Sequence, residues 1–234
     1  DVPGGQVNIA SSCNLKDKLH WSVEDLMTIV QEQGVEVNLG KELSAEEIRA
    51  MKPYAVFIAT GGTPIRPGSI PGTDRENVLV APEVILGEKV PKDQHVIVVG
   101  SGMTGLETTE KLNEAGNTVT VIEMAREIAP GTWFQLVDDE LERLNKTDTQ
   151  YKLGTRLLAV DGQGVTVEDV KSKEQYRIPA DYLVLSLGVR PTGTLARDLD
   201  KKSVTRIWRV GDAVKSGTIA DACHSAYDTV MAIR

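Results

Sequence analysis

Apolar and polar residues follow one another along the chain in blocks that predict alternating helices and strands. Segment 23–33 carries apolar residues at helical spacing, namely Val23, Leu26, Met27 and Val30. Residues 35–38 (VEVN) alternate as a short strand does, and Ser44 with Glu47 has the sequence of a helix-capping box. Residues 54–59 form an apolar run typical of a buried parallel strand.

The second part of the chain repeats this alternation after a connector. Residues 61–72 (GGTPIRPGSIPG) contain four glycines and three prolines, a density that predicts a link between two domains. Strands are then predicted at 96–99, 118–123, 150–153, 156–160, 163–167, 175–178, 182–187 and 207–210. Helices are predicted from the glycine motif to about residue 115, near 133–145, and from 218 to 233. The segments between 156 and 178 read as an antiparallel meander with Asp161-Gly162 as its first turn.

Composition narrows the functional classes. The chain is 41% hydrophobic and 26% charged, as a soluble globular protein is, and no apolar run approaches the roughly 20 residues of a membrane-spanning helix. A net charge of -8 argues against nucleic acid as a partner. Cys13 and Cys223 lie at opposite ends with no metal-ligand spacing, so we expect two buried thiols, no metal site and a cytoplasmic location. The opening at Asp1 predicts a piece of a longer protein.

The most specific motif lies at residues 95–110 (HVIVVGSGMTGLETTE), where an apolar strand leads into Gly100-x-Gly102-x-x-Gly105 and then into a helix. Gly100 permits a tight turn, Gly102 lets the backbone approach a pyrophosphate, and Gly105 lets the helix pack on the sheet. The helix N-terminus offers N–H groups to the anion. The motif predicts a dinucleotide-binding turn, against the alternative of a glycine turn that binds nothing. The positions between the glycines are Ser101, Met103 and Thr104.

Two acidic residues accompany this motif. Glu123 ends the next predicted strand, about 20 residues on, where a carboxylate accepts hydrogen bonds from ribose hydroxyls and repels a 2′-phosphate. The sequence therefore predicts NADH rather than NADPH, with Arg126 as the residue to suspect if the preference were reversed. Glu107 lies in the first turn of the helix, where the helix dipole stabilises a carboxylate whether or not it has a function.

An ordered series of motifs surrounds the glycine turn: 59–62 (ATGG), 70–72 (IPG), 187–191 (LGVRP) and 210–213 (VGDA). In this order they resemble the two-dinucleotide-binding-domain flavoproteins, the pyridine nucleotide-disulfide reductase superfamily in its broad sense. Together with the opening 4–11 (GGQVNIAS) and Lys16, they make nearly the whole chain similar to the C-terminal region of the NADH:flavin oxidoreductases. That group includes 2,4-dienoyl-CoA reductase, 2-enoate reductase, trimethylamine dehydrogenase and bile-acid-transforming relatives.

This resemblance implies an α/β fold in which a Rossmann-like NAD-binding domain is inserted into an FAD-binding Rossmann-like domain that lacks its N-terminal part. The implied boundaries are 1–62 and 201–234 for the partial FAD-binding domain and 63–200 for the NAD-binding domain. The implied cofactors are NAD, as NADH, and FAD in the full-length protein. FMN and a 4Fe–4S cluster are implied in a missing N-terminal TIM barrel.

The resemblance also assigns roles to single residues. Asp212 would hydrogen-bond the FAD ribityl chain with Gly211 beside the flavin, although Asp212 alone reads equally well as a plain helix cap. Thr60 and Gly61 would lie against the flavin nucleotide. Gly188 would line the nicotinamide site. The candidate catalytic residue is Glu107, pointing towards the flavin edge, and Thr192 stands where the family often has Asn.

The function expected from these motifs is an NADH-binding and hydride-accepting module, passing electrons from NADH to FAD and onward to the FMN/iron–sulfur barrel. The chain would be a fragment of an NAD(P)H-dependent flavin oxidoreductase, inactive by itself and holding FAD poorly because it has no second glycine fingerprint. The absence of Cys-x-x-Cys argues against a dithiol relay. The alternative is a structural, non-catalytic module that binds an adenine nucleotide. Expected partners are the nicotinamide dinucleotide and the missing barrel, with homo-oligomerisation left open.

Overall fold

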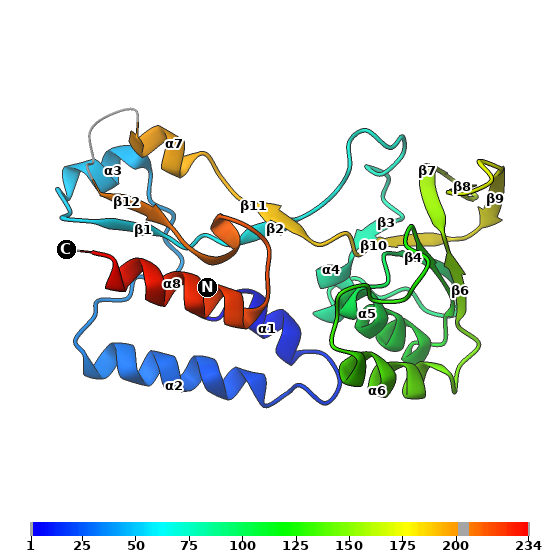
Figure 1. Cartoon of the computed structure of the whole chain (residues 1–234), viewed down its shortest axis with the longest axis horizontal. Coiled ribbons are helices and arrows are strands. Elements are labelled where there is room, and N and C mark those ends of the chain that lie inside the picture. The colour runs from blue at the N-terminus through cyan, green and yellow to red at the C-terminus, as the bar shows by residue number, and fades with distance from the viewer. Residues whose placement is uncertain (1, 201–205, 234) are drawn as a thin grey trace. The chain divides into compact units, whose positions relative to one another are not determined.

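The chain forms two compact units in the computed structural model, which describes residues 2–200 and 206–233 (Figure 1). Unit 1 comprises Asp1–Ser11, Lys16–Thr63 and Gly188–Arg234, and unit 2 comprises Ser12–Leu15 and Pro64–Leu187. The main part of unit 2 thus interrupts the sequence of unit 1. Its first boundary lies beside the predicted one at 62/63. The chain returns to unit 1 at Gly188, before the predicted position 200, and strand β11 (Val189–Pro191) pairs there with β2 (Gly62–Pro64).

Unit 2 is built on a parallel sheet of five strands in the order β3-β10-β4-β5-β6. The strands are β3 (Val78–Val80), β10 (Tyr182–Leu185), β4 (His95–Val99), β5 (Thr118–Glu123) and β6 (Gln150–Leu153). In β4 all side chains from Val96 to Val99 are buried, as expected of a parallel strand that is covered on both faces. The predicted α/β fold of Rossmann type is therefore confirmed.

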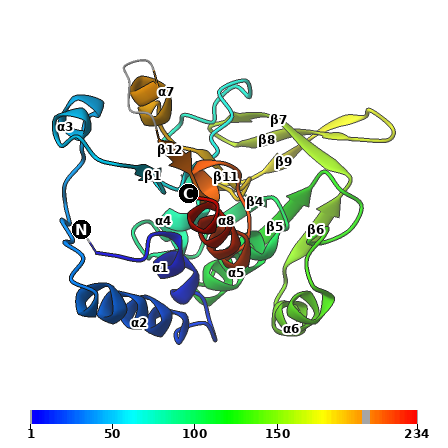
Figure 2. The same cartoon turned by 60° about the vertical axis from the view of Figure 1, so that its left-hand side comes forward.

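Different elements pack on the two faces of this sheet (Figures 1 and 2). On one side pack α4 (Ala81–Ile85), α5 (Met103–Glu114) and α6 (Phe134–Leu144). On the other lies the predicted antiparallel meander of β7 (Thr155–Asp161), β8 (Gly164–Asp169) and β9 (Gln175–Pro179). Ile97 and Ile122 pack against the meander residue Val167, whereas Leu106 and Leu144 form a separate helix-side core.

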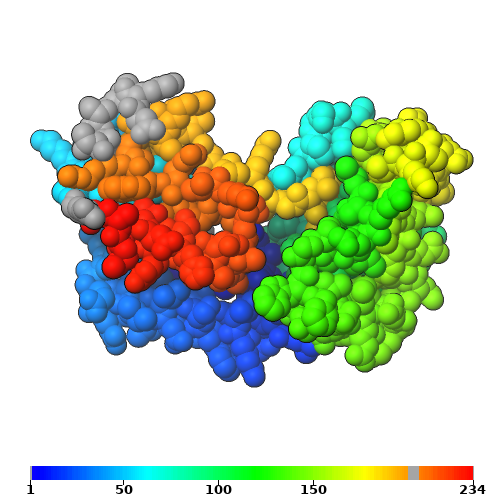
Figure 3. Space-filling model, viewed as in Figure 1, coloured from blue at the N-terminus to red at the C-terminus, as the bar shows by residue number. Residues whose placement is uncertain are grey.

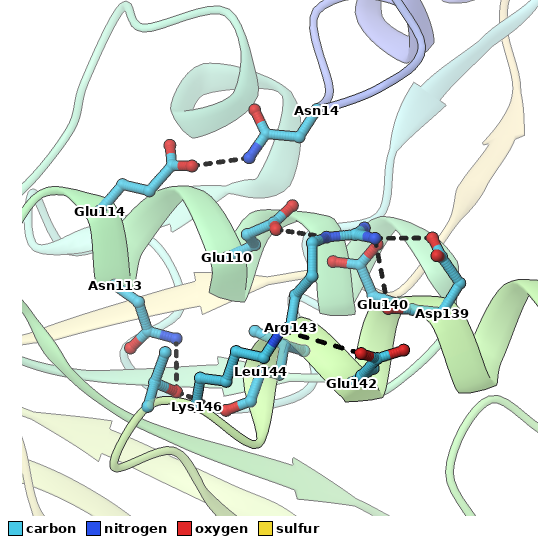
Figure 4. Close-up of polar contacts among 11 residues, drawn as sticks. Asn14, Glu110, Asn113, Glu114, Asp139, Glu140, Glu142, Arg143, Leu144 and Lys146 are labelled. Carbon is cyan, nitrogen blue, oxygen red and sulfur yellow. Dashed lines mark hydrogen bonds and ion pairs between the residues drawn. The ribbon is translucent and has the colours of Figure 1, made fainter.

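Arg143 of α6 ties this helix to α5 (Figure 4). Its Nε lies 2.6 Å from Glu110 Oε1, its Nη1 2.6 Å from Asp139 Oδ2, and its Nη2 2.5 Å from Glu140 Oε2. Burial disfavours the charged guanidinium, but the hydrogen bonds to Asp139 and Glu110 outweigh it and raise the pKa of Arg143. This cluster holds in place the helix that the glycine motif opens.

Unit 1 has a parallel pair of strands, β1 (Val56–Ile58) and β12 (Ile207–Arg209). Its other elements are α1 (Gln6–Ser11), α2 (Leu19–Glu32), α3 (Ala45–Ala50), α7 (Leu195–Asp200), the 3₁₀ turn η1 (Gly211–Ala213) and α8 (Ile219–Met231). A small core joins Ile48, Ile58, Leu199 and Ala213. Helix α8 has no fully buried residue and lies on the surface of this unit (Figure 3).

Several expectations differ from the structure in unit 1. Residues 35–38 are not a strand, because Val35 and Val37 face solvent (54% and 42% exposed) and no strand pairs with this segment in the described part of the chain. Helix α2 begins four residues before the predicted start and buries none of its residues. Of the two free cysteines, Cys13 is buried as expected, but Cys223 is exposed on α8. None of the described helices is long and apolar enough to cross a membrane.

Candidate functional site

The glycine motif lies at the carboxyl end of the central strand of unit 2. β4 is hydrogen-bonded to β5 on one side and to β10 on the other, so the strand order reverses its direction there. In open α/β sheets a ligand binds in the crevice at such a reversal. Gly100 continues the pairing with β5 through its N–H, which donates to Ile122 O at 2.9 Å, and Gly102 is the N-cap of α5.

The three glycines are required for different physical reasons. At Gly100 (φ +103°) a Cβ atom would lie 2.3 Å from Ser186 O, and at Gly105 it would lie 2.1 Å from Gly100 O. At Gly102 a Cβ atom would meet nothing within 4 Å, and this residue is exposed. Gly100 and Gly105 therefore serve the packing of the turn against the sheet. Gly102 leaves the backbone open to a ligand.

Glu123 is hydrogen-bonded to the glycine turn. Its Oε2 accepts from Ser101 N–H at 2.9 Å and from Ser101 Oγ at 3.1 Å, while its Oε1 accepts from Ala125 N–H at 2.8 Å. The structure thus places the predicted ribose-binding carboxylate next to the predicted pyrophosphate turn. Arg126 is exposed and lowers the pKa of Asp169 slightly, behind the larger effect of hydrogen bonds from Ser172 to that carboxylate.

The other predicted residues of unit 2 lie on the first turns of α5. Thr104 is exposed, whereas Met103 is partly buried against the helix-side core. The amides of both belong to the helix start, where N–H groups have no acceptor within the helix. Glu107 is a buried residue, 9% exposed. It lies in the second turn of α5 and not in the first turn as expected, because the helix begins at Met103. These positions form one continuous turn-and-helix segment within unit 2.

The predicted residues of unit 1 gather where its two parallel strands end. Thr60 and Gly61 follow β1, and Gly211 and Asp212 follow β12. The hydroxyl of Thr192 donates to Thr60 O at 3.0 Å and to Gly61 O at 2.9 Å. Thr192, which stands where the family often has Asn, therefore still provides a side-chain donor that holds the segment following β1.

Asp212 is held from two sides. Its Oδ2 accepts from Gln6 Nε2 at 2.9 Å, and its Oδ1 accepts from Gly217 N–H at 3.1 Å. Thr218, not Asp212, caps α8, because the Thr218 side chain accepts from Asp221 N–H. The plain helix-cap reading of Asp212 is thus wrong for α8. Gly188 is exposed with φ +76° and open space around its Cβ position.

Sequence reasoning gave no role to Gln6, although the opening GGQVNIAS contributed to the resemblance. The contact with Asp212 spans nearly the whole chain, so no local pattern could reveal it. For Ser101 the motif named only a position within the turn. Its complete burial and its two hydrogen bonds to Glu123 come from the tertiary structure.

A strand-turn-helix with an acidic strand end and a second αβ unit with its own polar strand ends define a dinucleotide-binding fold. Comparison with protein families matches residues 6–226 to the family described as pyridine nucleotide-disulphide oxidoreductase. The chain belongs to this family, which confirms the resemblance found in the sequence.

Individual relatives agree with this assignment. The chain is 33% identical to an NADH oxidase of Thermoanaerobacter brockii over 98% of its length, and 34% identical to a bilirubin reductase of Mediterraneibacter gnavus over 89%. The solved structure of a 2-naphthoyl-CoA reductase complex covers the whole chain with a TM-score of 0.89 at 24% identity, which shows the same fold. The chain spans about a third of the length of these proteins (36%, 32% and 35%).

Family membership implies FAD and NAD(P)H as cofactors. The residues present fit the nicotinamide dinucleotide and only part of FAD, because the sequence has no second Gly-x-Gly-x-x-Gly turn for the FAD pyrophosphate. In unit 2 the exposed backbone at Gly102 leaves room for a pyrophosphate where a side chain would otherwise begin. In unit 1 the ends of two parallel strands present polar groups at one sheet edge, the edge at which α/β sheets bind ligands. No group of three or more potential metal ligands occurs among the described residues.

Proposed function

We propose that this chain is the NADH-binding and hydride-accepting region of a longer flavin-dependent oxidoreductase. The proposal rests on a contrast within the glycine turn. A Cβ atom at Gly100 or Gly105 would clash with backbone oxygens, whereas a Cβ atom at Gly102 would meet no atom within 4 Å. Such a turn has no structural need for glycine at its middle position. A ligand that approaches the backbone there explains it.

Each predicted residue then has a defined task. The backbone amides from Gly102 to Thr104, at the exposed start of α5, bind the pyrophosphate of the dinucleotide, and Glu123 accepts hydrogen bonds from the adenosine ribose. Gly188 is proposed to line the nicotinamide site, and Glu107, the candidate catalytic residue, is proposed to point towards the flavin edge. The proposed flavin site consists of Thr60, Gly61, Gly211 and Asp212. FAD, when bound, supplies the acceptor for the hydride of NADH.

Electron transfer beyond FAD belongs to the parts of the protein outside this chain. The relatives are about three times as long as the chain, which supports further domains (36% and 32% of their lengths are covered). We propose that they include a barrel with FMN and a 4Fe–4S cluster, as in the NADH:flavin oxidoreductases. The chain by itself is then expected to bind nucleotide without turnover.

NADH is the proposed electron donor for two reasons. The carboxylate of Glu123 carries a charge that repels the 2′-phosphate of NADPH. The Thermoanaerobacter brockii relative is itself named an NADH oxidase.

Titration calorimetry of the 234-residue chain tests the proposal. We expect tighter binding of NADH than of NADPH, and a loss of at least about tenfold in NADH affinity for Gly102→Val, because the new side chain blocks the anion. The fold should survive this change, since nothing lies within 4 Å of the new Cβ. Gly68→Val is the matched control, because Gly68 is also open and lies in the connector.

Unchanged NADH binding by Gly102→Val would place the nucleotide elsewhere. Stronger binding of NADPH would reverse the assigned donor and direct attention to Arg126. Equal binding of ADP and NADH would favour the structural adenine-nucleotide module over a site that holds the nicotinamide for hydride transfer.

A further inference from the structure

Ser101 is completely buried between the turn and the end of β5, although its neighbour Gly102 is exposed. Both of its hydrogen-bond donors are directed to the same carboxylate oxygen, Glu123 Oε2, at 2.9 Å from the backbone nitrogen and 3.1 Å from the hydroxyl oxygen. Ser101 is therefore turned inward and has no donor left for a ligand.

The same hydroxyl also fixes the segment that follows Glu123. Ser101 Oγ accepts from the N–H of Ala129 at 3.2 Å. Ala129 has a left-handed backbone (φ +49°) and is 3% exposed within the helix-side core. A hydroxyl has one proton to give, so accepting from Ala129 and donating to Glu123 defines its orientation completely.

This arrangement limits what Glu123 can still bind. An ionised carboxylate has about four acceptor positions, and three are filled by the two donors of Ser101 and by Ala125 N–H at 2.8 Å. Glu123 is only partly buried, which leaves a ligand access to this residue. Oε1 accepts from one donor among the residues that the structure describes, and it is therefore the oxygen assigned to the ribose.

We propose that Ser101 is a positioning residue for nucleotide selection. Its hydroxyl holds the Glu123 carboxylate and the segment 124–129 in the binding geometry before the nucleotide arrives, so that preference for NADH depends on Ser101 as well as on the charge of Glu123. This inference rests on the proposed function, because it presumes a dinucleotide at the glycine turn.

Removal of the hydroxyl should act differently on the two nucleotides. NADH loses an aligned hydrogen bond to a charged acceptor, an effect of about fivefold to tenfold in affinity. The affinity for NADPH rises, because the carboxylate of Glu123 can turn away from the 2′-phosphate. The measured quantity is therefore the ratio of the NADPH to the NADH dissociation constant, which a general loss of stability leaves unchanged.

The experiment compares this ratio by calorimetry in the unaltered chain, Ser101→Ala, Glu123→Gln and the double variant. We expect Ser101→Ala alone to lower the ratio by about fivefold to tenfold. We expect the double variant to have the same ratio as Glu123→Gln alone, because both changes act through one carboxylate. The control is Thr73→Val, which removes another buried hydroxyl, bonded to Pro67 O and Ile70 O, outside the site.

Independent, additive effects of Ser101→Ala and Glu123→Gln would overturn the proposal, as would an unchanged ratio in folded Ser101→Ala. If Ser101→Ala does not fold, Ser101→Cys decides by the same criterion, since the thiol is of similar size and a weak donor. A chain that binds neither nucleotide would overturn the proposed function, and this inference with it. Preference for NADH with an unchanged ratio in Ser101→Ala would leave the proposed function standing and remove only the role of Ser101.

Discussion

At the scale of single residues, the helix-side core of unit 2 contains a polar group that its packing does not satisfy. The hydroxyl oxygen of Tyr151 is buried and has no hydrogen-bond partner among the described residues. Burial, reinforced by the nearby carboxylate of Glu140, raises the pKa of Tyr151 to about 12. The buried position of the Tyr151 hydroxyl is therefore unfavourable for a polar group, whether neutral or ionised.

Tyr151→Phe should therefore stabilise the protein. Removing a buried, unsatisfied hydroxyl gains on the order of 1 kcal/mol, which urea denaturation at pH 7 would detect. In the unaltered protein the folded-state pKa is raised, so stability should be full below pH 10 and should fall as pH rises from about 10 towards 12, where only the unfolded state loses the proton. The variant should lose this part of the alkaline decline.

Tyr227→Phe serves as the control, because Tyr227 is 65% exposed on α8 and no change is expected from it. A Tyr151→Phe protein that is clearly less stable than the unaltered chain would show that the hydroxyl has a partner in solution.

At the scale of elements, the contact between α5 and α6 depends on one cation among three carboxylates (Figure 4). The side chain of Glu140 is only 4% exposed, and that of Glu110 only 12%. Charges this deep are tolerated because Arg143 compensates them.

Arg143→Met should cost about 3 kcal/mol of unfolding free energy, since it keeps much of the aliphatic packing but leaves the buried carboxylates without their cation. Lys146→Met, in the turn that follows α6, is the matched control. The Lys146–Glu142 pair is 3.8 Å apart and 70% and 78% exposed, so its loss should be almost without effect. Equal losses in both variants, measured by urea denaturation, would refute a special role for the buried cluster.

Elements with their own local signals were predictable from sequence, and elements defined by pairing were not. The strand at β4, the glycine turn and the start of α5 carry apolar, glycine and helix signals within a few residues, and the structure has them where predicted. Residues 35–38 carry an equally clear alternation, but no strand pairs with them within residues 2–200 and 206–233. β11 and β3, of three residues each, are too short for a pattern and exist through their partners β2 and β10.

The candidate site divides in the same way. The glycines and Glu123 could be found because the chemistry of a pyrophosphate and a ribose requires those residue types at that spacing. The hydrogen bonds of Ser101, Thr192 and Gln6 join segments 22 to 206 residues apart, and no spacing rule specifies them.

At the scale of the whole molecule, unit 2 contains its own sheet, both of its covering layers and its cores between Pro64 and Leu187. Only the short segment Ser12–Leu15 of this unit comes from elsewhere in the chain, and Asn14 contributes an exposed hydrogen bond of 2.6 Å to Glu114.

Residues 64–187 produced alone should therefore fold cooperatively. They should bind NADH within about threefold of the full chain, a difference of under 1 kcal/mol, because neither the glycine turn nor Glu123 belongs to the part removed. Circular dichroism during thermal unfolding and calorimetry would measure both. A broad, non-cooperative transition would show that unit 2 depends on unit 1 for its stability.

The pairing of β2 with β11 has a consequence for how such proteins are assembled by recombination. Because these strands are hydrogen-bonded neighbours, the chain leaves unit 1 and comes back to it at adjacent points. A gene segment that encodes residues 64–187 can be replaced by that of a relative with the opposite coenzyme preference, since the host has to close only a short gap whichever insert it carries. The junction at Thr63 and Gly188 is then a natural recombination point, at which the proposed NADH-binding unit can be exchanged while the proposed flavin-binding residues of unit 1 are inherited intact.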